Sequence, residues 1–115
     1  MAHREMSNKL PNPSDILNGK PVELKTREIS ALYSLTLAMC YELKELNEKR
    51  DPNLSKKINN YLKYSMDHFE TELVVMGLKL AITKYMLPID PDEIDCFDEF
   101  HERYGRYIHS AVAGD

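Results

Sequence analysis

Segments that contain proline divide this chain into stretches in which apolar residues recur at helical spacing. Asp51-Pro52 and the segment from Pro88 to Pro91 each interrupt such a stretch, because proline lacks a backbone N–H and restricts the residue before it. The 115 residues suit one domain, and 43% hydrophobic residues are typical of a globular chain. We therefore expect an all-α protein.

The apolar pattern predicts three helices, over residues of about 21–50, 53–87 and 91–112. The first carries a seam that begins with Val22 and Ile29. The second is apolar nearly all round after residue 73, so more than one neighbour must cover it. Asp90 precedes Pro91 and is expected to cap the third helix.

Short connections between these helices predict an antiparallel three-helix bundle built on a long helical hairpin. The third helix would then return along the second and bring His101 close to Gly77. Residues of about 36–66 would project from the bundle as a two-helix tip. Residues 1–20 are expected to form an extended, irregular N-terminal arm with one helical turn at 14–17, and residues 21–115 a single helical domain.

The composition argues against a membrane or a secreted protein. No uncharged stretch approaches the roughly 20 residues that span a bilayer, and the first residues are polar. We expect a cytoplasmic protein without membrane contact, in which Cys40 and Cys96 are reduced thiols. The acidic residues around Cys96 are expected to raise the pKa of its thiol.

Acidic side chains concentrate near the predicted third helix. Residues 67–115 hold 4 basic and 11 acidic side chains, and none of the basic ones lies between Asp90 and Glu102. Acids at a helix start are favoured by the helix dipole, so a solvated helix face is one interpretation. The other is a docking surface for a protein with a basic surface. Its candidate residues are Asp92, Glu93, Asp95, Asp98, Glu99 and Glu102.

The projecting tip suggests an alternative, because lysine beside exposed tyrosine suits phosphate contact and base stacking. The chain carries a net charge of −4, which makes nucleic acid the less favoured partner. The residues of this basic tip are Lys49, Arg50, Lys56, Lys57, Tyr61, Lys63 and Tyr64.

A metal-dependent helical bundle is a second alternative. Asp98 and His101 give one aspartate version of the Glu-x-x-His pair that a di-metal bundle needs twice. His68 and His109 fall among acids as well. Since the pattern is incomplete, we expect neither a metal nor a cofactor.

The sequence contains no phosphate-binding glycine-rich loop, no Gly-x-Ser-x-Gly and no Cys-x-x-Cys. We therefore expect no enzyme activity. The function that remains is binding and modulation of another macromolecule by a regulator, inhibitor or adaptor. The apolar surface of residues 73–87 exceeds what two neighbouring helices can cover, so we also expect a homodimer.

Overall fold

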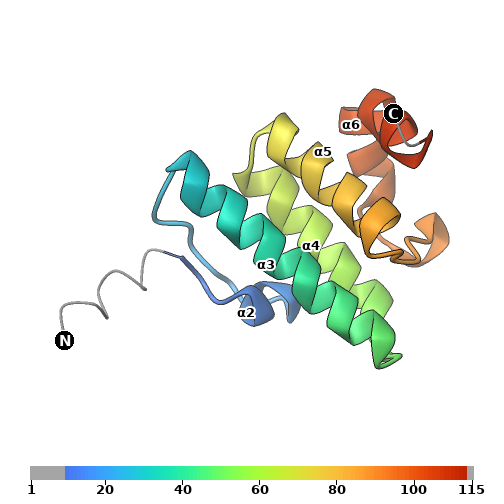
Figure 1. Cartoon of the computed structure of the whole chain (residues 1–115), viewed down its shortest axis with the longest axis horizontal. Helices are drawn as coiled ribbons and strands as arrows, with labels where there is room; N and C mark the ends of the chain where they lie inside the picture. Colours follow the sequence, from blue (N-terminus) through green and yellow to red (C-terminus); the bar gives the residue numbers. More distant parts are fainter. Residues whose placement is uncertain (1–9, 114–115) are drawn as a thin grey trace.

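The computed structural model describes the backbone of residues 10–113 and the side chains of residues 10–105. All regular secondary structure in this range is helical, which confirms the all-α class. The elements are α2 (Pro13–Leu17), α3 (Ile29–Glu48), α4 (Leu54–His68), α5 (Thr71–Lys79), a π-helical turn η1 (Leu80–Lys84), a 3₁₀ turn η2 (Pro91–Glu93) and α6 (Phe97–Ala113). Helices α3, α4 and α5 pack on one another with alternating direction, α2 packs on α3 and α4, and α6 packs on α5 and α4 (Figure 1).

The segment before α3 forms one helical turn and then an extended strip. Asn12 caps α2 by accepting a hydrogen bond from the backbone N–H of Ser14, and Ile16 and Leu17 are buried in the core. Gly19 ends the turn with a φ of 79°, in the left-handed region that glycine tolerates. The predicted turn at residues 14–17 is therefore confirmed.

The first long helix begins eight residues later than predicted. Residues 20–28 have no helical structure, and α3 starts at Ile29. Val22, Leu24 and Thr26 are half-buried while the residues between them are exposed, which is the period-two alternation of an extended segment. The prediction of a helix from residue 21 is wrong. Val22 and Ile29 are seven residues apart, a spacing that suits a helix, but the chain between them is extended.

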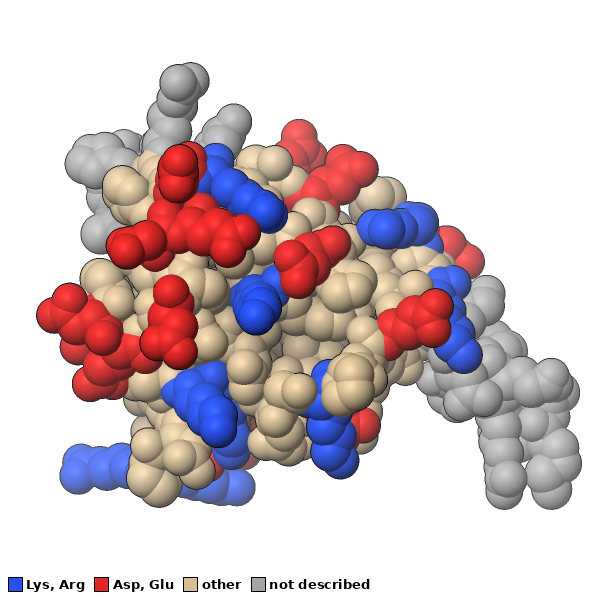
Figure 2. Space-filling model, turned by 180° about the vertical axis from the view of Figure 1, so that it is seen from behind, with Lys and Arg blue, Asp and Glu red and all other residues tan. Residues whose placement is uncertain are grey.

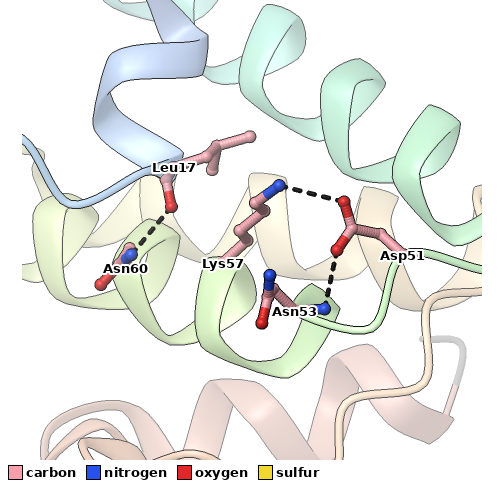
Figure 3. A network of polar contacts seen from close by, with 5 residues as sticks. All are labelled: Leu17, Asp51, Asn53, Lys57 and Asn60. Carbon is pink, nitrogen blue, oxygen red and sulfur yellow. Dashed lines mark hydrogen bonds and ion pairs between the residues drawn. The ribbon is translucent and has the colours of Figure 1, made fainter.

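The connection between α3 and α4 follows the predicted break. Arg50 takes a φ of 56°, and the backbone N–H of Asp51 donates to the carbonyl of Leu46, as at many helix C-termini. The Asp51 carboxylate accepts hydrogen bonds from the backbone N–H of Asn53 at 2.7 Å and from Lys57 Nζ at 3.0 Å (Figure 3). The Asp51 side chain thus links the residue before α4 to the first turn of that helix.

The predicted helix over residues 53–87 is two helices. The chain reverses at Phe69 and Glu70, which have extended backbone angles, so α5 runs back along α4 instead of continuing it (Figure 1). The Phe69 ring is buried against Tyr64, and Arg27 donates to the last carbonyl of α4, that of His68, at 2.8 Å. Burial and a distant side chain hold this reversal, where the local sequence has neither glycine nor proline.

The third predicted helix also begins late. Asp90 does accept the expected capping hydrogen bond, from the backbone N–H of Asp92, but it caps only η2. Ile94 is buried with extended backbone angles, and α6 starts at Phe97 and kinks at Tyr104. The kink divides α6 into two parts, and the predicted start of this helix at residue 91 is wrong.

Gly77 does not face His101. A Cβ atom on Gly77 would overlap the Tyr61 hydroxyl and lie 2.9 Å from Cγ2 of Thr36, so glycine permits α5 to approach α3 and α4 closely. His101 is exposed and lies against Gly105 of its own helix. The predicted contact fails because α5, after the reversal, turns this face toward α3 and α4.

Residues 36–66 do not project as a two-helix tip. Helix α2 covers α3 and α4 on one side, where Asn60 Nδ2 donates to the carbonyl of Leu17 at 2.8 Å (Figure 3). Helix α5 packs against both of them as well. The predicted tip therefore lies within the body, and its central side chains Met39, Leu43 and Leu62 are fully buried.

Candidate protein-binding surfaces

The six candidate carboxylates of the acidic surface are all exposed. Asp92 and Glu93 lie in η2, Asp95 in the following turn, and Asp98, Glu99 and Glu102 in the first turns of α6. The backbone N–H of Cys96 donates to Oδ1 of Asn59 at 3.0 Å and fixes this segment on α4. Figure 2 shows acidic side chains gathered toward the left, the side on which η2 and α6 lie.

Two of these carboxylates have partners in the described part of the chain. Glu93 accepts a hydrogen bond from the hydroxyl of Ser55 on α4, and Glu99 forms an ion pair of 3.0 Å with Arg103 one turn later. For the remaining four, Asp92, Asp95, Asp98 and Glu102, no side-chain partner occurs among the described residues. Their charge is therefore presented to solvent.

Cys96 lies half-buried at the inner edge of this acidic surface. Burial raises the pKa of the Cys96 thiol, and the charges of Glu99 and Asp95 raise it further, while a backbone hydrogen bond and Lys63 oppose them. The predicted direction is confirmed, although desolvation contributes more than the acids do. A thiol with a raised pKa is a poor nucleophile at neutral pH.

The tyrosines of the basic tip are not exposed, although exposed tyrosine beside lysine was the reason to consider nucleic acid as a partner. Tyr61 and Tyr64 are buried, with 1% and 9% of their surface exposed, so neither offers a ring face for base stacking. Lys57 is held by Asp51, whereas the remaining basic residues are exposed; these are Lys49, Arg50, Lys56 and Lys63. The sequence alone did not distinguish exposed from buried tyrosines in the basic tip, because tyrosine side chains occur both in the core and in contact with water.

Tyr61 is instead part of a polar contact in the core. The Cys40 thiol lies 3.5 Å from both the Tyr61 hydroxyl and the carbonyl oxygen of Gly77. Burial raises the pKa of Cys40 to about 11 and also raises the pKa of Tyr61, so both groups remain protonated at neutral pH. The three residues tie together α3, α4 and α5.

The histidines do not assemble with other ligands in the described residues. No group of three or more His, Cys, Asp or Glu side chains there is placed to hold a metal ion. His68 stacks on Tyr64 with 4.1 Å between ring centroids, and its Nδ1 lies 3.1 Å from the Tyr64 carbonyl oxygen. The side chain of His109 lies outside the described residues.

A second candidate surface is an apolar face formed by α5 and the start of α3. One groove of about 520 Å³ is lined by residues of α5 alone, namely Thr71, Glu72, Val75, Met76 and Lys79. A neighbouring groove of about 310 Å³ shares Glu72 and Met76 and extends to Ile29 and Tyr33 of α3. We call this combined surface the α5 face.

The sequence located the α5 face only in part. The excess of apolar residues after Leu73 pointed to α5, but Ile29 was expected in the core seam. It is 67% exposed, and Tyr33 is 46% exposed one turn later. The first turn of α3 therefore leaves these two side chains exposed next to α5.

Sequence reasoning missed a third feature, a cleft between the extended segment and α4. Its volume is about 320 Å³, and its lining combines backbone near Gly19 with polar side chains of α4. Those side chains include Asn60, Lys63, Asp67 and His68. The cleft exists only because residues 20–22 are extended, so a helical prediction for this segment concealed it.

Comparison of the chain with models of protein families, with curated proteins and with solved structures finds no match. In the described residues, no helix is both long enough and apolar enough to cross a membrane.

Proposed function

We propose that this chain is a non-enzymatic cytoplasmic protein that binds another protein and modulates it, as a regulator, inhibitor or adaptor. The acidic surface is the docking face, and its partner carries a basic surface. The observation that carries the proposal is the set of four exposed carboxylates for which the described residues supply no partner: Asp92, Asp95, Asp98 and Glu102. Complementary charge across an interface speeds association and selects partners.

The fold supports this proposal because the acidic side chains are not needed in the core. Ile94 and Phe100 point inward and are buried, while the carboxylates between and after them are exposed. A helix needs acids in its first turn for at most a modest gain from the dipole. Glu102 lies beyond the first turn of α6, where that gain has faded.

The test compares wild type with a variant in which four carboxylates become amides: Asp95→Asn, Asp98→Asn, Glu99→Gln and Glu102→Gln. Both serve as bait for proteins from the source cells, at low and at high salt. We expect the basic partner to be recovered with wild type at low salt and lost with the variant. Circular dichroism should show nearly equal helicity, since exposed substitutions usually change stability by within about 0.5 kcal/mol.

A matched control removes four exposed carboxylates elsewhere, with Glu23→Gln, Glu28→Gln, Glu48→Gln and Asp67→Asn. This control has the same net charge as the first variant and should keep the partner. Recovery of the same proteins with all three baits contradicts the acidic surface as a docking face.

We also propose that the protein is a homodimer. The α5 face supports this, because Val75 and Met76 are only half-buried and Ile29 and Tyr33 are exposed beside them. Contiguous apolar surface of this kind commonly marks an interaction site. Sedimentation velocity between about 1 and 200 µM should reveal a species of twice the chain mass.

A further inference from the structure

The outward side of α3 carries no charged residue along most of its length. No Asp, Glu, Lys or Arg lies between Glu28 and Glu42, although the outward side of a surface helix normally carries charged and polar residues. Six residues at helical spacing form this side, and all of them are exposed or half-buried: Ser30, Tyr33, Ser34, Leu37, Ala38 and Tyr41. We call these six residues the α3 face.

Two tyrosines are the largest side chains of the α3 face. Tyr33 and Tyr41 leave 46% and 53% of their surface exposed. At the end of the face, Lys44 Nζ lies 5.3 Å from the centre of the Tyr41 ring and forms an ion pair with Glu48, so this lysine is engaged within its own chain. The cores of protein interfaces are enriched in tyrosine and depleted of charged residues, which is the combination found on this face.

The order of the large side chains on the α3 face is the same in both directions along the helix. Tyr33 and Tyr41 each lie four residues from Leu37. When two α3 helices pack antiparallel about a two-fold axis at Leu37, the two Leu37 side chains meet, and each Tyr33 meets Tyr41 of the second copy. The small side chains of Ser34 and Ala38 allow the helices to approach. The face is therefore complementary to itself, as an isologous interface requires.

We propose that the homodimer forms through two antiparallel α3 helices, with Leu37 on the two-fold axis and a Tyr33–Tyr41 contact on either side of it. The proposal rests on the dimer proposed above and names the centre of its interface. The α3 face continues into the α5 face, because Tyr33 lines the groove that also contains Ile29 and Met76. These two residues enlarge the contact toward the roughly 1,200 Å² or more that stable dimers bury.

The charged residues around the α3 face do not decide its occupant. Glu70 and Glu72 line the groove beside Tyr33, and Glu45 follows beyond Tyr41, but none of them belongs to the face. An uncharged face gains nothing from a partner that is selected by charge, such as the basic protein expected at the acidic surface. Homodimer interfaces are more apolar than those of transient complexes. This property and the symmetrical order of the side chains favour a second copy as the occupant.

The test places charges at residue 37 and measures the association of purified full-length chains by sedimentation velocity. In Leu37→Glu and in Leu37→Lys, like charges meet at the axis, and we expect the dimer dissociation constant of each variant to rise at least about tenfold. An equimolar mixture of the two variants places Glu opposite Lys. We therefore expect a mixed dimer with a dissociation constant at least about fivefold below that of either variant alone.

Two control variants, Met86→Glu and Met86→Lys, make the same change from an apolar to a charged side chain outside the α3 face. Met86 follows η1 and is 77% exposed, so both controls should keep the dissociation constant within about threefold of wild type. Circular dichroism of every variant shows whether the fold is retained. Tyr33→Ala and Tyr41→Ala replace any Leu37 variant that does not fold, and each should raise the dissociation constant at least about tenfold because it removes both tyrosine contacts.

Three results would overturn the proposal. Wild type that stays monomeric at 200 µM removes the dimer itself and leaves the α3 face to a different protein. A dimer that tolerates both folded Leu37 variants, or both tyrosine variants, places its interface elsewhere. A mixture of Leu37→Glu and Leu37→Lys that associates no more tightly than each variant alone rules out a two-fold axis at Leu37. None of these results bears on capture of a basic partner by the acidic surface, and the last two leave the homodimer itself intact, so the proposals fail separately.

Discussion

The chain reverses direction twice around α4, and the two reversals are held in different ways. At the first, between α3 and α4, the polar contacts of the turn itself come from nearby in the chain: Arg50 adopts left-handed geometry, and the Asp51 carboxylate binds Asn53 and Lys57. The helix ends on either side of this turn also bond to distant residues, Asn47 to Met86 and Ser55 to Glu93. At the second, between α4 and α5, the main contacts are burial of Phe69 and a hydrogen bond from Arg27, 41 residues away.

This difference separates local from tertiary control of the fold. The first reversal has its own breaker, Pro52, and local hydrogen bonds to the Asp51 carboxylate, so it depends less on the packing of the rest of the chain. The second has neither, and it needs the extended segment before α3 and the core to be in place. Changes at the second reversal should therefore cost more and spread further than changes at the first.

The largest effect is expected from Phe69→Ala. The ring is 6% exposed and packs edge-on against Tyr64, so its loss removes apolar burial and leaves a cavity. Truncations of this kind typically cost about 3–5 kcal/mol. Urea unfolding followed by circular dichroism measures the change. Pro52→Ala, at the first reversal, provides the comparison and should cost much less because Pro52 is exposed.

The next largest effect concerns the contact that fixes α5 after the second reversal. Gly77→Ala would place a methyl group in the space of the Tyr61 hydroxyl, and we expect a loss of about 1–3 kcal/mol. Tyr61→Phe removes that hydroxyl, so the double variant should be more stable than the sum of its parts predicts. If Gly77→Ala instead raises the melting temperature through helix propensity, the close approach of α5 to α4 is contradicted.

The two reversals also explain how much of the fold the sequence could predict. Asp51-Pro52 marks the first reversal and predicted the end of the first long helix, while the helical spacing of apolar residues predicted the all-α class. The segment from His68 to Thr71 contains no breaker, so a single helix over 53–87 was the natural but wrong expectation. Three further errors follow from this one. They are the projecting two-helix tip, the contact between Gly77 and His101, and the set of helices that pack on α5.

The same distinction between local and tertiary control applies to the candidate surfaces. The exposure of the acidic residues was predictable, because charge density and helix position depend on nearby residues alone. The burial of Tyr61 was not, because it depends on Cys40 and Gly77 from two other helices. The exposure of Ile29 depends on the extended conformation of residues 20–28. The spacing of apolar residues along the sequence does not distinguish that conformation from a helix.

A smaller effect is expected from Arg27→Ala, which removes the hydrogen bond to the carbonyl of His68. A hydrogen bond that involves a charged group contributes about 1.5–3 kcal/mol, and exposure at this site should reduce the loss to about 1 kcal/mol. Hydrogen exchange should show faster opening at the end of α4 and the start of α5, with the first reversal unchanged. Uniform acceleration through all helices would show that Arg27 acts on the whole fold and not on the second reversal.

The smallest effect concerns Asp51 at the first reversal, and it depends on pH. The hydrogen bond from Asn53 and the contact with Lys57 lower the pKa of the Asp51 carboxyl. A folded-state pKa below the unfolded value stabilises the fold above the unfolded pKa, and this contribution disappears as pH falls through the folded value. Asp51→Asn keeps an oxygen acceptor but loses the charge. Its melting temperature should therefore lie below that of wild type at pH 7, and the two curves should converge toward pH 2.5.

Glu48→Gln, which removes an exposed ion pair with Lys44 at the end of α3, controls for the change in net charge. A difference between Asp51→Asn and wild type that persists unchanged at pH 2.5 would mean that amide geometry, and not the lost carboxylate charge, weakens the first reversal. The effect should stay below that of Arg27→Ala because Arg50 and Pro52 continue to favour the same turn without Asp51, whereas the second reversal has no local substitute.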